Sequence, residues 1–265
     1  MFSSITNFIR DFQADPLGAL VTLIYLTVCI LFSLIIHECA HGYAALKCGD
    51  PTAKMLGRLT LDPRKHLDPI GTICMVLLRV GWAKPVPVNP RNFRNYRRDY
   101  IIVSLAGIVT NLIIFILSLL ISAILAKFIW TEETMEALRY YNQKGLILNI
   151  YEGLLPSAVY GGVFGAVEMY ANGVSLMYIQ RFFLMLAQMN LGLAVFNLLP
   201  VPPLDGYRFL DQFAFKGRLN MNPQTMQYIR IGFLFVCVSG MLNGLLTTVN
   251  SALFGWASSL ISMII

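Results

Sequence analysis

Two histidines and a glutamate lie within five residues of one another, in the order His37-Glu38-Cys39-Ala40-His41. Residues four positions apart lie on one face of a helix, so the imidazoles of His37 and His41 point toward the same ion. Glu38 is one step further round, where its carboxylate reaches a water beside that ion. Two imidazole ligands and a carboxylate base are the arrangement of zinc hydrolases, so the motif predicts a zinc site with Glu38 as its general base.

The segment that carries this motif is strongly apolar. Between residues 17 and 46 Glu38 is the one Asp, Glu, Lys or Arg, and the segment is long enough to cross a bilayer as a single helix. A carboxylate inside such a helix is costly and indicates function, with a bound metal as its partner. The alternative is a structural pair of histidines bonded to neighbouring helices. The metal interpretation is favoured because the whole chain has three histidines and two of them form the motif.

A third ligand is expected, because a catalytic zinc takes three protein ligands and keeps a fourth position for water. The candidates are His66 and Asp205. Prolines at positions 200, 202 and 203 precede Asp205, and each removes an N–H donor and clashes with the preceding turn, so the helix before them must end. Unwound backbone at membrane depth is tolerated where it lines a cavity. Asp205 therefore either faces the site or caps a following helix, and the residues alone favour neither.

The composition indicates an integral membrane protein. Hydrophobic residues make up 57% of the 265-residue chain and charged residues 13%. We expect one membrane-embedded domain over residues 1–265, an all-α polytopic bundle of about four to six transmembrane helices. The net charge of +6 does not indicate nucleic acid, because eleven Lys or Arg stand against four Asp between Lys47 and Asp99. That local excess is typical of a cytoplasmic loop.

Apolar runs and their breaks predict the order of segments. The run before Val80 is too short for a normal span and is expected to be a re-entrant or partly immersed segment. Residues 83–90 alternate Pro with Val and are expected to form an extended edge. Residues 153–176 are left undecided between an outer-surface and a partly inserted segment, and residues 250–265 are expected to form a short outer-surface helix. The four clear spans are residues 17–46, 101–127, 177–199 and 229–249.

Charge predicts how these spans are oriented. The basic segments 47–100 and 200–228 are expected inside, and the Glu-bearing segment 128–152 outside. The histidine motif then lies toward the cytoplasmic face.

Two motifs of the sequence belong together: His37-Glu38-x-x-His41 and Asn197-x-x-Pro200-x-Pro202-Pro203-Leu204-Asp205-Gly206. Together they resemble the site-2 protease family of intramembrane zinc metalloproteases, and the second motif is the more specific. Gly107-Ile108-Val109-Thr110-Asn111 and residues 81–89 add to the likeness, which covers most of residues 30–215.

The resemblance implies one Zn²⁺ per chain, with Asp205 as the third ligand, and leaves His66 as an interface or neighbouring residue. It implies hydrolysis of a peptide bond within or next to a transmembrane helix of another protein, as in regulated intramembrane proteolysis. It is consistent with a minimal form that lacks a PDZ or CBS domain, in a bacterial inner membrane. Asn111 is expected to bind the oxyanion or the substrate backbone, or else to form a small-residue packing surface with Gly107.

Two other functions compete with the protease. In a metal-binding transporter, the same ionisable groups would line a permeation path. Against this, no internal repeat is evident in the sequence. A membrane scaffold that keeps the fold without activity is disfavoured, because every expected catalytic residue is present.

Overall fold

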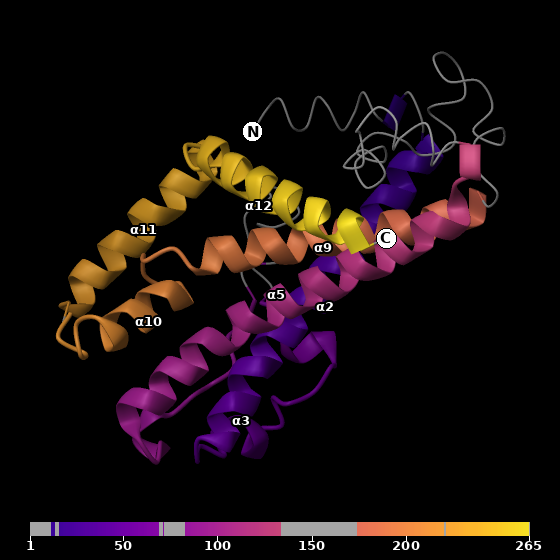
Figure 1. Ribbon diagram of the computed structural model, residues 1–265. Coiled ribbons are helices and arrows are strands. Elements are labelled where there is room, and N and C mark those ends of the chain that lie inside the picture. Colours follow the sequence, from indigo (N-terminus) through magenta and orange to yellow (C-terminus); the bar gives the residue numbers. More distant parts are fainter. Residues whose placement is uncertain are drawn as a thin grey trace. The chain divides into compact units, whose positions relative to one another are not determined.

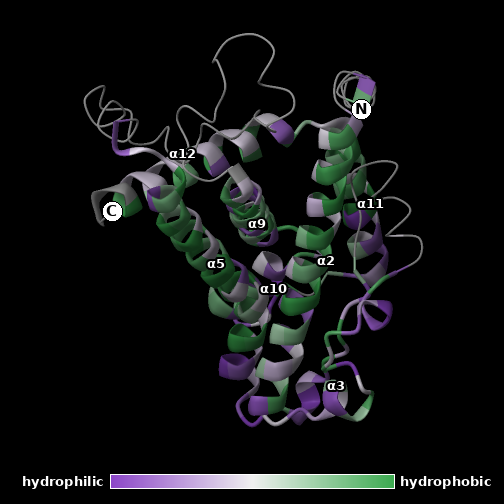
Figure 2. Cartoon of the chain, turned by 90° about the vertical axis from the view of Figure 1, so that its right-hand side faces the viewer, coloured by the Kyte–Doolittle hydropathy of each residue, from purple (hydrophilic) through white to green (hydrophobic). Residues whose placement is uncertain are grey.

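The computed structural model describes residues 12–13, 16–68, 71, 83–133, 174–219 and 221–264. Three of its helices are long and apolar enough to cross a membrane: α2 (Pro16–Lys47), α5 (Tyr96–Ile129) and α9 (Val174–Asn197) (Figure 1). Hydrophobic residues run along much of these helices (Figure 2). The protein is therefore an all-α polytopic membrane protein, as predicted, and the three spans expected at 17–46, 101–127 and 177–199 are confirmed.

Shorter elements connect these helices. They are α3 (Thr52–Met55), the 3₁₀ turns η1 (Pro63–Lys65) and η2 (Pro90–Asn92), and α10 (Asp205–Phe213). Of the predicted extended edge at 83–90, the described residues pair in a single antiparallel bridge, between Leu67 and Ala83, and form no strand. The predicted re-entrant segment before Val80, and most of 128–152 and 153–176, lie outside the described residues.

The prediction of one span at 229–249 with a separate helix after it is wrong. Helix α11 (Pro223–Ser239) ends at Gly240, and α12 (Asn243–Ile264) continues through the C-terminal apolar run. Gly240 has φ of +79°, a left-handed conformation that a helix cannot continue through and that glycine adopts at little cost. The two helices are bent by 74°, so they count together as at most one further span.

Contacts divide the chain into two compact units. One contains residues 31–113 and 190–248, and the other contains 2–30, 114–189 and 249–265. Helices α2, α5 and α9 each contribute one part to each unit. All the candidate site residues belong to the first unit.

Helix α2 ends in a Schellman motif directly after the histidine motif. The N–H of Gly49 donates to the Leu46 carbonyl at 3.2 Å, and that of Asp50 donates to the Ala45 carbonyl at 2.9 Å. Gly49 has φ of +109°, which closes the helix and turns the chain. The end of α2 therefore rests on backbone hydrogen bonds.

The proline-rich segment after α9 is unwound, as expected. Helix α9 ends at Asn197, and α10 begins at Asp205 with Leu204 as its N-cap. A Cβ at Gly206 would lie 2.2 Å from the Leu198 carbonyl oxygen, so the first turn of α10 approaches this backbone more closely than an alanine allows. Asp205 thus opens a helix that is packed tightly against the end of α9.

Candidate metal centre

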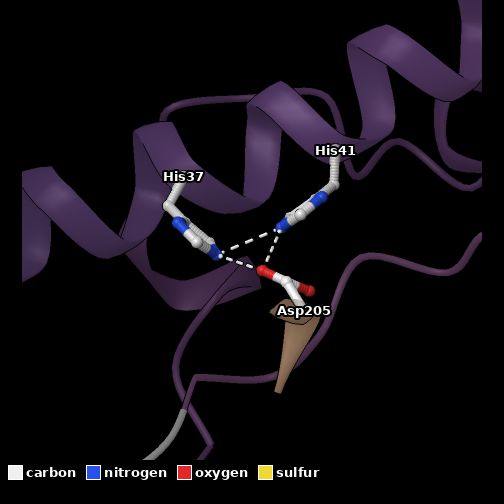
Figure 3. A group of neighbouring side chains, drawn as sticks. All are labelled: His37, His41 and Asp205. Atoms are coloured by element: carbon white, nitrogen blue, oxygen red, sulfur yellow. Dashed lines mark hydrogen bonds and ion pairs between the residues drawn. The ribbon is translucent and has the colours of Figure 1, made fainter. Parts of the chain in front are cut away.

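Three side-chain atoms from two distant parts of the chain converge on one point (Figure 3). Nε2 of His37 lies 3.1 Å from Nε2 of His41. Oδ2 of Asp205 lies 3.2 Å from the His37 nitrogen and 3.0 Å from the His41 nitrogen. The three residues are 6–7% exposed and form the group of possible metal ligands found in the described part of the chain.

This donor set fits a zinc ion. Ligand atoms bound to a tetrahedral zinc at about 2.0–2.1 Å lie roughly 3.3 Å apart, and the three observed separations approach that value. Two imidazole nitrogens and one carboxylate oxygen are also ligands that zinc prefers. A cation among them satisfies all three atoms at once, whereas hydrogen bonds alone leave two nitrogens facing the same oxygen.

The charge of Asp205 suits this position. Burial raises the pKa of its carboxyl, but hydrogen bonds from His37 and His41 outweigh burial and hold the pKa well below its usual range. The other oxygen, Oδ1, lies 3.8 Å from Nη1 of Arg208, one helical turn further along α10. Asp205 therefore offers a charged carboxylate to a cation at this position. The alternative of a simple helix cap fails, because the cap position belongs to Leu204 and the Asp205 side chain turns to the histidines.

One face of α5 supports the two imidazole rings. Nδ1 of His41 lies 2.7 Å from the Val103 carbonyl oxygen, and Nδ1 of His37 lies 3.2 Å from the amide nitrogen of Asn111. Between them, a Cβ at Gly107 would lie 2.4 Å from Cε1 of His37 and 2.5 Å from Nε2 of His41. The rings occupy the space that a side chain at position 107 would fill. The small-residue surface predicted at Gly107 therefore receives side chains of α2.

Glu38 faces the opposite wall of the site. Its Oε2 accepts the backbone N–H of Val86 at 2.8 Å, and with His41 and Asp205 it lines a pocket of about 180 Å³. This carboxylate is free of the ligand group and open to the pocket, which is the position that a general base needs. Apolar residues dominate the remaining pocket wall, among them Val88, Phe93 and Val103, while Tyr100, Ser104 and Arg208 add polar groups.

Polar contacts hold the segment that forms this wall. Arg58 donates from Nη2 to the carbonyl oxygens of Lys84 and Pro85 at 2.9 and 3.1 Å. Asp50, just beyond α2, accepts the N–H of Asn89 and the side-chain amide of Asn92, each at 2.7 Å. Residues 84–92 are thereby tied to the end of the helix that carries the histidines.

Helix α10 is fixed at both ends. At its start, Gly206 packs on the Leu198 backbone. At its end, Arg97 of α5 donates from Nε and Nη2 to the carbonyl oxygens of Gln212 and Phe213, both at 3.0 Å. These carbonyls have no partner within α10, so the guanidinium caps the helix. The position of Asp205 is consequently set by contacts at both ends of a nine-residue helix.

His66 does not join the metal centre. It is 1% exposed, and its Nε2 lies 2.7 Å from the Thr60 carbonyl oxygen and 3.9 Å from Sγ of Cys39. It steadies the turn after α3 and contacts the outer side of the histidine motif. Sequence reasoning did not anticipate the Val103 carbonyl, the Val86 N–H or Arg97, because two of these groups are backbone atoms that any residue carries.

A cation held by two imidazoles and a carboxylate, beside a second free carboxylate, defines a metal-dependent hydrolase built on membrane helices. The comparisons with known proteins agree. Residues 25–239 match the model of peptidase family M50, so the chain belongs to that family, the site-2 proteases, and is a zinc metalloprotease. No solved structure matches the chain.

Among curated proteins, the chain is 36% identical over 220 residues to "Putative zinc metalloprotease YwhC" of Bacillus subtilis, covering 81% of this chain and 80% of that protein. It is 25% identical over 231 residues to "Putative zinc metalloprotease Rip2" of Mycobacterium tuberculosis, covering 85% of this chain and 68% of that protein. Both names agree with a protease, and neither supports the transporter or scaffold alternatives.

Proposed function

We propose that this zinc metalloprotease cleaves a peptide bond within or next to a transmembrane helix of another membrane protein. The supporting observation is the place of the ligands. His37 and His41 lie on α2, a 32-residue helix apolar enough to span a bilayer, and Glu38 is the one Asp, Glu, Lys or Arg between positions 17 and 46. A protease that acted on soluble chains has no need to bear the cost of a carboxylate in such a helix.

The chain supplies distinct groups for hydrolysis. His37, His41 and Asp205 would hold the zinc ion, which when bound lowers the pKa of a water and polarises the scissile carbonyl. The Glu38 carboxylate takes a proton from the attacking water and passes it to the leaving amine. Its contact with the Val86 N–H fixes the direction of the carboxylate before substrate enters.

We propose that residues 83–90 hold the substrate in extended form. A helix keeps its carbonyls in internal hydrogen bonds, so the substrate must unwind locally before attack. An extended chain laid along this segment gains backbone hydrogen bonds in the manner of an added strand. Val86 and Val88 line the pocket next to Glu38, and their packing against the core holds in place the backbone along which the unwound segment would pair.

We further propose a bacterial cell (inner) membrane as the location, with the site toward the cytoplasm. The support for this orientation is charge. The segment that follows the histidine motif contains Lys47, Lys54 and Arg58, and the start of α5 carries Arg97 and Arg98. Basic residues gather on the cytoplasmic side of membrane proteins. Cleavage there would release a substrate fragment, which is the basis of regulated intramembrane proteolysis.

The test uses membranes from cells that produce either the wild type or Glu38→Gln at matched levels. Glutamine keeps an oxygen for the Val86 N–H and removes the base. New N-termini are labelled chemically and mapped by mass spectrometry. The proposal expects wild-type-specific termini inside or beside the spans of membrane proteins. Wild-type-specific termini confined to soluble proteins or to large extramembrane domains would refute it.

A further inference from the structure

The two histidine ligands are each supported from behind by α5. Val103, Gly107 and Asn111 are spaced four residues apart and therefore share one face of that helix. Val103 presents its carbonyl oxygen to Nδ1 of His41, and the amide nitrogen of Asn111 lies 3.2 Å from Nδ1 of His37. Gly107 leaves the space in which the rings lie. The two Nε2 atoms, across each ring from Nδ1, face Asp205.

Asn111 is placed to serve the ring rather than the substrate. Its side chain is fully buried, at 0% exposure, and it does not line the pocket that contains Glu38, His41 and Asp205. Its Oδ1 is buried and has no hydrogen-bond partner among the described residues. An oxyanion or substrate contact requires an amide N–H that reaches the pocket, and this geometry does not offer one.

The chemistry of the ligand explains what Asn111 does. An imidazole that binds a cation through Nε2 carries its proton on Nδ1, and that N–H needs an acceptor. A carboxamide supplies one when it turns its oxygen toward the ring, a half rotation that changes little in volume. The same rotation gives the buried Oδ1 a partner. The Nδ1–H of His41 donates in the same way to the Val103 carbonyl oxygen.

We propose that Asn111 is a positioning residue that accepts the Nδ1–H of His37 and so sets the tautomer and the orientation of that zinc ligand. This inference rests on the zinc-binding role given to His37 and not on where the enzyme cuts its substrate. It replaces the expected role of Asn111 at the oxyanion or the substrate backbone. The essential atom of Asn111 is therefore an acceptor oxygen, whereas an oxyanion role requires a donor N–H.

Two substitutions separate these roles. Asn111→Asp keeps an acceptor oxygen and removes the donor, while Asn111→Leu has a similar size and removes both. Zinc affinity of the full-length protein in detergent is measured by competition with a chromophoric chelator, with zinc alone as the ligand. We expect Asn111→Leu to weaken zinc binding by about 10- to 100-fold and Asn111→Asp to bind within about threefold of the wild type and to retain cleavage.

Histidine labelled with ¹⁵N provides a readout that a purely structural role does not change. The chain has three histidines, so His41 and His66 serve as internal controls. In the zinc-bound wild type, the Nδ1–H signals of His37 and His41 should both show hydrogen bonding. In Asn111→Leu the His37 signal alone should shift and exchange faster with water.

Several results would overturn the proposal. Wild-type zinc affinity or an unchanged His37 signal in Asn111→Leu would remove the positioning role. Asn111→Asp that binds zinc normally but loses cleavage would restore the oxyanion role, and this comparison decides the matter if the leucine variant does not fold. A folded wild type that binds no zinc would refute the metal site on which the inference rests.

Discussion

Replacing Gly107 with alanine should weaken zinc binding without unfolding the protein. The new Cβ would lie 2.4 Å from Cε1 of His37 and 2.5 Å from Nε2 of His41, whereas ordinary van der Waals contact begins at 3.4 Å. Each ring must therefore move by roughly 1 Å or tilt away from α5. A misplacement of about 1 Å in a reactive site costs on the order of 100-fold, and we expect a loss of zinc affinity of that size.

The same substitution should stabilise the helix backbone, so a loss of zinc affinity can be assigned to the metal centre and not to a weakened helix. Alanine is favoured over glycine within a helix by about 1 kcal/mol, so α5 itself is not weakened. Gly232 in α11 has no atom within 4 Å of its added Cβ and provides the matched control. The assay compares zinc affinity by chelator competition and metal-free melting temperature for both variants. Zinc affinity in Gly107→Ala equal to that of the Gly232→Ala control would refute the packing of the rings on Gly107.

Three further predictions concern the supports of the site. Gly206→Ala places a Cβ 2.2 Å from the Leu198 carbonyl oxygen, so it should lower the free energy of unfolding by about 1–3 kcal/mol and reduce zinc content. Thermal melting and elemental analysis measure the two effects, and unchanged values would contradict the close approach of Gly206 to Leu198. Burial raises the pKa of the Asp50 carboxyl, but the hydrogen bonds that it accepts outweigh burial and lower the pKa below 3.8. The contribution of Asp50 to folding stability is therefore complete above pH 3.8 and is lost as the pH falls through the lower pKa of the folded state. The stability gap between wild type and Asp50→Asn should therefore narrow on acidification below pH 3.8, and a gap that stays constant would count against the charged form. Alanine at both Val86 and Val88 should slow cleavage roughly tenfold with zinc retained, and unchanged cleavage would argue against substrate binding along this segment.

Much of the helical framework is predictable from the sequence, because long uncharged runs have few alternatives to a spanning helix. The ends of α2 and α9 fall close to the predicted limits, since Gly49 and the prolines after position 199 stop each helix for local reasons. The break at Gly240 was missed, because it lies inside an apolar run whose hydropathy does not change. A single glycine in a left-handed conformation redirects the chain without altering composition.

The sequence predicts the metal-binding residues of the site better than the groups that hold their side chains in place. The spacing of His37 and His41 brings their imidazoles together on any helix, and the aspartate after the prolines is a natural third partner. The groups that hold these side chains cannot be identified from residue types or spacing. The Val103 carbonyl and the Val86 N–H are backbone atoms, and the cap that Arg97 places on α10 requires a contact across more than a hundred positions.

The most direct test of the metal centre is the zinc content of the purified protein, with the wild type beside Asp205→Ala. Alanine removes the carboxylate at the first residue of α10 and leaves Gly206 and the Arg97 cap in place. A centre built from His37, His41 and Asp205 predicts about one zinc per chain in the wild type and a sharp loss in the variant. Equal zinc in both proteins, or none in a folded wild type, would contradict it.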